Sequence, residues 1–197
     1  MQGYSPAAEN NKSAILSVLE NYLSDGDRVL EIGSGSGQHA IHVSASLQNI
    51  QWQPSDQAVA LPLLRANIRE YGSPNLSEPI ELNLARLPES SQTPVQCVYS
   101  ANVMHIVSKP LGDQLIRWAA DILVDWGYLI LYGPYKYDGD FTTQSNTDFD
   151  LWLKNRDPHS GIRDFEWVSQ LATQAGLCLV EDYSMPANNQ CLIFRKS

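Results

Sequence analysis

Three glycines at alternate positions, preceded by a carboxylate, form the stretch whose residue types best suit ligand binding. Gly33, Gly35 and Gly37 follow the strand-like run Arg28–Ile32, which contains Glu31, and a helix-compatible segment begins soon after them. This order predicts a strand, a tight loop and a helix. Glycine tolerates positive φ and has no Cβ, so a ligand can approach the backbone closely while the N–H groups of the helix start face it. The stretch therefore indicates a site for a nucleotide-like cofactor.

The spacing of the glycines separates the cofactor classes. In the dinucleotide pattern G-x-G-x-x-G the third glycine would fall at Gln38, whereas this sequence has G-x-G-x-G. Asp56 lies 23 residues beyond Gly33, a distance that suits a carboxylate accepting hydrogen bonds from ribose hydroxyls. Proteins that bind dinucleotides and proteins that bind other nucleotide-like cofactors both use such a carboxylate. A nicotinamide (NAD(P))-dependent oxidoreductase is therefore the less favoured interpretation, and a purely structural tight turn is a third.

Strand-like and helix-like segments alternate along most of the chain. Ser5 and Pro6 suit the N-cap and the first position of a helix, which an apolar stripe at helical spacing then continues. Later helices are expected at residues 39–47, 61–71, 111–124, 146–155 and 164–175. Strands are expected at residues 28–32, 50–53, 80–84, 95–101 and 127–132, with a closing antiparallel pair at 177–183 and 191–194. Polar loops are expected at residues 86–94 and 136–145, the second of them mobile.

This alternation predicts an α/β fold, in which parallel strands are joined by right-handed crossovers and covered by helices on both faces. With the closing hairpin, the expected sheet has seven strands and is mostly parallel. Ligands bind such sheets beyond the carboxyl ends of the strands. The glycine loop, Asp56, Asn83 and residues 102–105 and 132–135 follow strand ends, so we expect them to face one crevice.

Length and charge limit the organisation of the chain and its partners. The 197 residues suit one well-buried domain, which we expect to cover residues 1–197. Thirteen Lys and Arg against 22 Asp and Glu give a formal charge of -9, and no basic run occurs. The charge argues against nucleic acid as a partner and is easier to reconcile with a small molecule or a basic protein.

The cysteines, histidines and N-terminus indicate the compartment. Cys97, Cys178 and Cys191 lie in apolar runs, and their odd number and scattered spacing predict buried free thiols in a reducing environment. The four histidines lack zinc-site spacing, so we expect no metal. No signal peptide or run of membrane-spanning length is recognised, so we expect no membrane contact and a cytoplasmic location.

Motifs spread over nearly the whole chain resemble one family. They lie at residues 4–12, 30–40, 52–56, 102–106, 131–135, 145–146, 156–158, 161–164 and 185–189. The form E-x-G-x-G-x-G resembles the first motif of class I S-adenosylmethionine (SAM)-dependent methyltransferases. The whole set resembles the methyltransferase-like protein 26 family, an uncharacterised branch of that class. The resemblance implies a Rossmann-like class I methyltransferase fold with SAM as cofactor, and it supplies no substrate.

Carried over to matching positions, the resemblance implies a set of cofactor-binding residues. The amino-acid end of SAM would be held by Glu31, Gly33, Ser34, Gly35 and Gly37, and the ribose by Asp56. Asn83 and Leu84 would flank the adenine, and Asn102 would close the site after the fourth strand. Relatives tend to carry an aspartate where this chain has Asn83. The amide can still accept a hydrogen bond from the adenine amino group, but it brings no charge.

Methyl transfer asks for few catalytic groups, because the sulfonium is already an activated donor and catalysis comes mainly from holding the acceptor in line. A base is needed only if the acceptor starts protonated. His105 is the best candidate base, since it lies at the crevice and titrates near neutral pH. A structural histidine behind the cofactor is the alternative. Tyr132 and Tyr135 complete the expected catalytic set. They would line the acceptor pocket, and the alternative is that they only cover the end of the sheet.

Substrate-binding residues are expected in the polar motifs outside the glycine loop. The set is Asn10, Lys12, Arg156, Arg163, Asn188 and Asn189. The polar start of the first helix is either a lid over the cofactor or a solvated helix end. Arg156 and Arg163, with Asp157 between them, either bind an anionic substrate or form a surface ion-pair cluster. Residues 102–105 lack the Asn/Asp-Pro-Pro-aromatic motif of nucleobase amino-methyltransferases, which argues against methylation of nucleic-acid bases.

The sequence therefore predicts a single-domain SAM-dependent methyltransferase whose unidentified acceptor is a small molecule, with a protein acceptor left open. Because the cofactor motifs are clearer than any catalytic set, a non-catalytic SAM-binding or protein-interaction module with this fold is the alternative.

Overall fold

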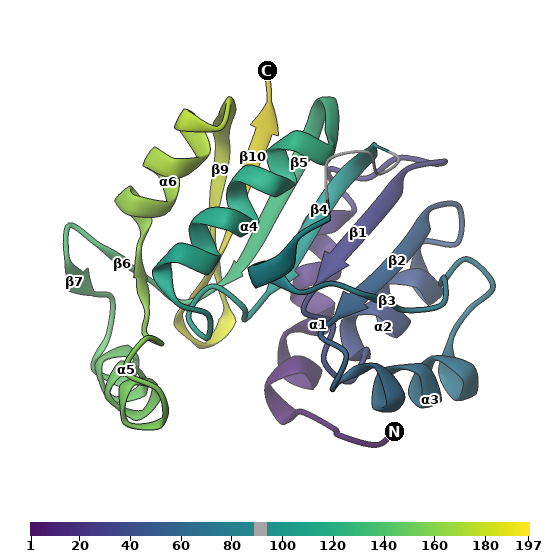
Figure 1. The fold of residues 1–197 in the computed structure, drawn as a ribbon, viewed down its shortest axis with the longest axis horizontal. Coiled ribbons are helices and arrows are strands. Elements are labelled where there is room, and N and C mark those ends of the chain that lie inside the picture. Colours follow the sequence, from purple (N-terminus) through teal and green to yellow (C-terminus); the bar gives the residue numbers. More distant parts are fainter. Residues whose placement is uncertain (89–93) are drawn as a thin grey trace.

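A seven-stranded sheet forms the centre of the molecule (Figure 1). The computed structural model describes residues 1–88 and 94–197, so part of the loop expected at residues 86–94 lies outside the described residues. The strands of this sheet, in spatial order, are β3 (Ile80–Glu81), β2 (Gln51–Asp56), β1 (Arg28–Ile32), β4 (Val95–Ala101), β5 (Leu123–Gly133), β10 (Asn189–Lys196) and β9 (Leu177–Met185). The helices are α1 (Pro6–Leu19), α2 (Gln38–Ser46), α3 (Leu61–Tyr71), α4 (Lys109–Ile122), α5 (Gln144–Arg156) and α6 (Phe165–Gln174).

The strand pairings confirm the predicted fold. The five strands β3, β2, β1, β4 and β5 run parallel, while β10 pairs antiparallel with both β5 and β9. The chain order of the strands reverses between β1 and β4, which makes this the topological switch point where α/β sheets bind ligands. The glycine loop follows β1 directly, so it lies at that point.

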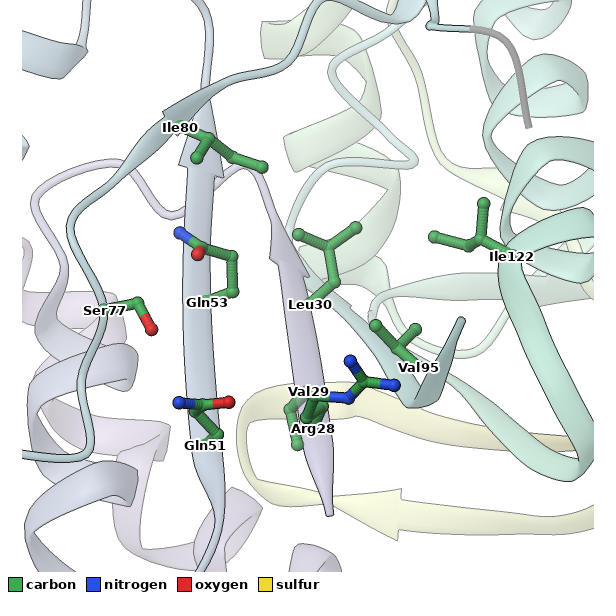
Figure 2. Close-up of a pocket in the computed structure, with 9 residues that line it drawn as sticks. All are labelled: Arg28, Val29, Leu30, Gln51, Gln53, Ser77, Ile80, Val95 and Ile122. Atoms are coloured by element: carbon green, nitrogen blue, oxygen red, sulfur yellow. The ribbon is translucent and has the colours of Figure 1, made fainter. Parts of the chain in front are cut away.

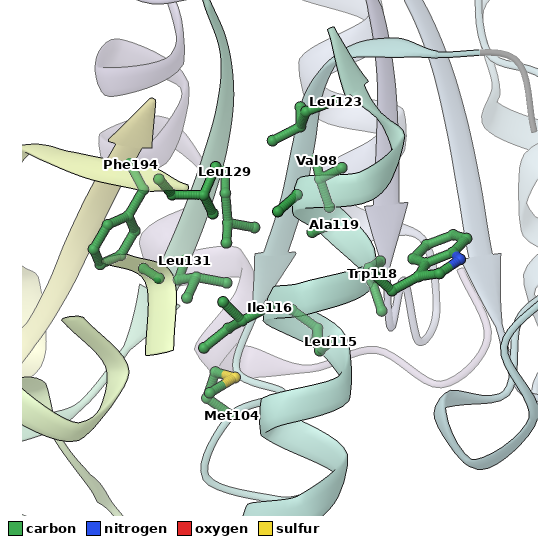
Figure 3. Close-up of a cluster of buried hydrophobic side chains, with 14 of the residues drawn as sticks. Val98, Met104, Leu115, Ile116, Trp118, Ala119, Leu123, Leu129, Leu131 and Phe194 are labelled. Atoms are coloured by element: carbon green, nitrogen blue, oxygen red, sulfur yellow. The ribbon is translucent and has the colours of Figure 1, made fainter. Parts of the chain in front are cut away.

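Helices cover both faces of the sheet, because successive strand residues point to opposite sides. In β5, Leu129 and Leu131 join the cluster under α4 and α6, while Ile130 and Tyr132 join the cluster under α1, α2 and α3. Figure 3 shows Leu115, Ile116 and Ala119 of α4 packed toward strand side chains that include Val98 and Leu129. In Figure 1, α4 and α6 lie in front of the sheet and α1 and α2 behind it.

The start of α1 forms as its residue types predict. The Ser5 hydroxyl accepts a hydrogen bond from the Ala8 backbone N–H at 3.3 Å, and Pro6 occupies the first turn, where its missing N–H leaves no bond unmade. This local chemistry fixes where the polar end of α1 begins.

Three sequence predictions are wrong in detail. The third strand ends at Glu81 rather than residue 84, because the Asn83 side chain accepts a hydrogen bond from the Ala85 N–H and begins a 3-10 helix, Leu84–Arg86. The expected loop at 136–145 instead contains β6 (Tyr135–Tyr137) and β7 (Asp140–Phe141), which form a small sheet with β8 (Arg163–Asp164). Cys97 and Cys191 are buried free thiols as predicted, whereas Cys178 is exposed on the edge strand β9.

Candidate cofactor and acceptor site

The three glycines of the loop have different structural reasons for being glycine. All have positive φ: 78° at Gly33, 57° at Gly35 and 83° at Gly37. A Cβ at Gly33 would lie 2.4 Å from Val103 Cγ2, and one at Gly37 would lie 2.8 Å from Leu64 Cδ1. A Cβ at Gly35 would meet nothing within 4 Å. Packing therefore requires the first and third glycines, while the second faces open space.

Glu31 lies beneath the glycine loop and holds it in place. The carboxylate accepts hydrogen bonds from Ser34 Oγ at 2.8 Å and from Trp52 Nε1 at 3.1 Å. Burial raises the pKa of Glu31 to about 7, although both hydrogen bonds oppose that shift. Because Glu31 and Ser34 are both buried, they act on the shape of the loop.

Asp56 ends β2 and joins the loop from the other side. Its Oδ2 accepts a hydrogen bond from the Gly35 N–H at 2.7 Å, and its Oδ1 accepts one from the Gln57 N–H at 2.7 Å. The carboxylate thus sits at the switch point, where the sequence placed a ribose-binding group.

A first cavity, the glycine-loop cavity, opens beside these residues with a volume of about 200 Å³. It is lined by Ile32, Gly33, Asp56, Gln57, Leu82, Leu84, Asn102, Val103, Ile106 and Val107. Gly33, Asp56, Leu84 and Asn102 of the expected cofactor set therefore come together. Asn83 does not line this cavity, since its side chain is engaged with the following backbone.

A second cavity, the asparagine-lined cavity, has a volume of about 550 Å³. It is lined by Ala7, Asn10 and Asn11 of α1, Asn102, Tyr132, Pro134, Ser145, Asn146 and Phe149 of α5, and Pro186, Ala187, Asn188 and Asn189. Segments far apart in the sequence thus form one cavity, in which the expected residues Asn10, Tyr132, Asn188 and Asn189 meet.

Asn102 belongs to both cavities. It directly follows β4, has a left-handed φ of 59°, and its N–H donates a hydrogen bond to the Tyr132 carbonyl oxygen at 2.8 Å. This bond ties the residue between the cavities to the end of β5. A molecule in one cavity and a molecule in the other would therefore meet at Asn102.

His105 lies behind the wall of the asparagine-lined cavity and is only 5% exposed. Its ring makes an edge contact with Phe149, with centroids 5.3 Å apart, and a Cβ at Gly133 would lie 3.4 Å from its Nδ1. Burial and the positive charge of Arg163 lower the pKa of His105 to about 4. The ring is therefore neutral at pH 7, and it lines neither cavity.

The two tyrosines of the expected catalytic set lie on opposite faces of the sheet. Tyr132 lines the asparagine-lined cavity, whereas Tyr135 lies in the core under α4 and α6 and lines neither cavity. Both are about 1% exposed. The Tyr135 hydroxyl has no hydrogen-bond partner among the described residues, whereas Asn11 and Asn189 lie beside the Tyr132 hydroxyl and oppose the rise of its pKa. Burial raises the pKa of both phenols, so both are neutral at pH 7.

The three expected cationic residues all lie outside both cavities. Arg163 is buried and donates hydrogen bonds to the carbonyl oxygens of Met104, Val107 and His159, which ties down the segment after β4. The Arg156 guanidinium lies over the Trp152 ring, with its Cζ 4.7 Å from the ring centroid. Arg156 also lines a separate hollow with Asp157. Lys12 is paired with Glu9 one turn away on α1.

Sequence reasoning missed the polar residues that join α1 to the glycine loop. His39 Nε2 lies 2.7 Å from Asn11 Oδ1, and its Nδ1 lies 3.3 Å from the Tyr99 hydroxyl. Asn67 Nδ2 donates to the carbonyl oxygens of both Gln2 and Ser36. The signal for Asn67 was present, since it is a polar residue on the apolar stripe of α3.

A further cavity of about 200 Å³ lies at the opposite ends of β1 and β2. Figure 2 shows Arg28, Val29 and Leu30 of β1 beside Gln51 and Gln53 of β2 in its wall. None of the expected site residues lines it. Because it lies away from the carboxyl ends of the strands, it is not the candidate site.

Two further features bear on the class of protein. Within residues 1–88 and 94–197, no helix combines the length and apolar character needed to span a membrane. Over the same described ranges, no three His, Cys, Asp or Glu side chains gather as metal ligands would.

Solved structures of methyltransferases have the same fold. An O-methyltransferase family 2 protein from Planctomyces limnophilus, in complex with apigenin, shares 17% identity at a TM-score of 0.85, covering 97% of this chain and 58% of that one. An O-methyltransferase family protein from Burkholderia thailandensis shares 17% identity at a TM-score of 0.82, covering 94% and 56%. Human N-acetylserotonin methyltransferase, in complex with SAM, shares 11% identity at a TM-score of 0.80, covering 94% and 51%. The fold is that of class I SAM-dependent methyltransferases.

This chain spans about half the length of those proteins, and at such identities the likeness shows the fold alone. A family model gives the particular assignment. Residues 2–196 match the family described as "Protein of unknown function (DUF938)", and the chain belongs to that family.

Proposed function

We propose that this protein binds SAM at the glycine loop and transfers its methyl group to a small molecule held in the asparagine-lined cavity. The observation that carries the proposal is the position of Asn102 in the walls of both cavities. A donor and an acceptor in adjoining cavities meet at one point, which is the arrangement that methyl transfer by approximation requires.

The residues present fit the cofactor. Asp56 offers a carboxylate to the ribose, Leu84 offers an apolar surface to the adenine, and the open space over Gly35 admits the amino-acid end. Glu31 and Ser34 support the loop from below. Bound SAM supplies an activated methyl group, while the protein positions the acceptor and excludes water.

The wider assignments rest on the same site. We propose that the chain falls within the methyltransferase-like protein 26 family, because the motifs that resemble that family are spread over nearly the whole chain. We treat residues 1–197 as one domain, acting in the cytoplasm on a small molecule. The cavity also favours an enzyme over a purely SAM-binding or interaction module, since a cofactor alone does not need it.

Calorimetric titration with SAM, S-adenosylhomocysteine and NADH tests the cofactor. We expect micromolar binding of the first two and none of NADH. Gly35→Asn should weaken SAM binding by at least about tenfold, because the side chain enters open space over the loop, and Asn tolerates the left-handed backbone. Gly26→Asn is the matched control, since Gly26 also has positive φ and an open Cβ direction but precedes β1. Tighter binding of NADH, or equal effects of both substitutions, contradicts the proposal.

A further inference from the structure

A cavity of about 300 Å³, the aromatic cavity, opens at the end of the sheet opposite to the glycine loop. Its wall comes from the chain that follows α1, from the residue before β1 and from the first halves of β4 and β5. The glycine loop and Asp56, in contrast, lie at the carboxyl ends of β1 and β2. The aromatic cavity shares no lining residue with the glycine-loop cavity or the asparagine-lined cavity, so it is a separate site.

Three aromatic side chains line this cavity: Tyr22, Trp126 and Tyr128. The ring centroids of Tyr22 and Tyr128 are 5.2 Å apart and the ring planes are inclined at 68°, so the two rings form a corner. The Trp126 side chain is 65% exposed, and its backbone has a φ of 66°, which a bulky residue rarely adopts. Neither core packing nor backbone preference therefore accounts for a Trp at this position. Ring faces attract cations, which makes a cation the natural ligand for such a wall.

The charges of the aromatic cavity favour the same kind of ligand. Asp27 and Asp125 line it, and among the described residues its wall contains no Lys, Arg or His. Asp27 accepts a hydrogen bond from the Ser24 N–H at 2.8 Å, which orients the carboxylate without neutralising it. Arg195 is the cation recorded against these rings, with its Cζ 5.1 Å from the Trp126 centroid. Two carboxylates against one guanidinium leave the cavity negative, so it attracts a cation.

The end of α1 adds to this field. Tyr22 follows the last residues of α1, so the negative end of the helix dipole lies beside the cavity, and the last turn of α1 has no basic residue. The comparable end of α4 receives a cation from within the chain, because Lys196 Nζ donates to the carbonyl oxygens of Ala120 and Leu123. A cation in the aromatic cavity would complement the end of α1 as Lys196 complements the end of α4.

The lining also selects among cations. A metal ion needs several oxygen ligands, and within the described ranges no three His, Cys, Asp or Glu side chains gather to provide them. A primary ammonium is strongly hydrated and has three N–H groups that need acceptors. A quaternary ammonium presents only methyl and methylene groups around its charge. Ring faces and carboxylates that do not contact it directly are therefore sufficient for its binding.

We propose that the aromatic cavity binds a quaternary ammonium group, which belongs either to a small molecule or to a trimethylated lysine side chain of a protein. This inference goes beyond the proposed function and does not depend on it, since the two sites share no residue.

A matched pair of probes tests the role of the charge. Choline carries a trimethylammonium group, and 3,3-dimethylbutan-1-ol has the same shape with carbon in place of the charged nitrogen. A short alanine peptide with one trimethyllysine separates the two sources of the group. Binding is followed in NMR titrations through the indole N–H signal of Trp126 and, in the variants, through the backbone N–H signal of Gly127.

We expect choline to move the Trp126 indole signal with a millimolar Kd and to leave the signal of Trp152, an exposed Trp outside the cavity, in place. The neutral alcohol should bind at least about fivefold more weakly, because it lacks the charge that the rings and carboxylates attract. Tighter binding of the peptide than of choline assigns the group to a protein partner, and the reverse order assigns it to a free small molecule.

Substitutions locate the site. Trp126→Asn should weaken choline binding at least about fivefold, and Asn suits the left-handed backbone, so the fold is kept. Asp125→Asn should weaken it about twofold. Trp152→Gln and Asp148→Asn are the matched controls on α5, outside the cavity, and should have no effect. Equal binding of the alcohol, a shift of Trp152 in place of Trp126, no shift at millimolar choline, or equal effects of the cavity and control substitutions overturns the inference.

Discussion

Gln38 holds both backbone groups of Ser5. Its Oε1 accepts a hydrogen bond from the Ser5 N–H at 2.6 Å, and its Nε2 donates one to the Ser5 carbonyl oxygen at 3.2 Å. Gln38 begins α2 directly after the glycine loop, while Ser5 is the N-cap of α1. One side chain therefore joins the loop of the cofactor site to the helix that carries Asn10 and Asn11 into the asparagine-lined cavity.

Replacing Gln38 by Leu should loosen this connection. The variant leaves the Ser5 N–H and carbonyl without their partner, and we expect the free energy of unfolding to fall by about 1–3 kcal/mol. SAM affinity should fall as well, because the glycine loop loses its link to α1. Gln48→Leu is the control, as Gln48 is exposed beyond the end of α2. Urea unfolding and calorimetry measure the two effects, and equal stability of both variants contradicts the role given to Gln38.

The buried Glu31 carboxyl should leave a signature in the pH dependence of stability. Its pKa is raised from 4.5 to about 7 in the folded state, so the folded protein binds more protons than the unfolded chain between these values. The free energy of unfolding contributed by Glu31 therefore decreases as pH rises from about 4.5 to 7, by on the order of 3 kcal/mol. His39 and His105, with pKa values lowered to about 4, act in the opposite sense below pH 6.5.

The difference between wild type and Glu31→Gln isolates this contribution. Wild type should lose stability relative to the variant as pH rises from 5 to 7.5, because only wild type must ionise a buried group. Urea unfolding across this range measures the difference, and the histidine contributions cancel in the comparison. A difference that is constant with pH would show that Glu31 titrates near its ordinary pKa.

Tyr132 and Tyr135 should respond differently in function. The Tyr135 hydroxyl is buried without a partner among the described residues, so Tyr135→Phe should leave the free energy of unfolding unchanged or raise it by up to about 1 kcal/mol. Tyr132→Phe should change that free energy by at most about 1 kcal/mol, because Asn11 and Asn189 lie beside this hydroxyl. Only Tyr132 lines the asparagine-lined cavity, so only its replacement should change the affinity for a small molecule bound there. Equal loss of affinity in both variants would instead favour the expectation from sequence that the two tyrosines share a role.

Arg163 and Arg156 should separate in a stability measurement. Arg163→Met leaves the carbonyls of Met104, Val107 and His159 without a donor in a buried region, which should cost about 2–4 kcal/mol. Arg156→Met removes only a contact with the half-exposed Trp152 ring, so its effect should stay within about 0.5 kcal/mol. Thermal and urea unfolding of the two variants measure this, and similar values contradict the structural role of Arg163.

The sequence by itself determined the elements whose cause is local. Ser5 and Pro6 start α1 because capping involves neighbouring residues, and the alternation of strand and helix patterns leads to the parallel sheet. Asp56 was placed beside the glycine loop because the carboxyl ends of adjacent parallel strands meet at one edge. These features depend on short-range chemistry or on rules of chain topology.

Only the tertiary structure decided which polar residues share a cavity. Tyr132 and Tyr135 are three residues apart in extended chain and point to opposite faces, and the elements packed on each face decide which of them lines the cavity. Arg163 carries a charge that suggests a surface, and three carbonyls from distant segments bury it. The asparagine-lined cavity draws its walls from α1, β5, α5 and the turn between β9 and β10. No local pattern specifies such a meeting, because it depends on how separate elements pack.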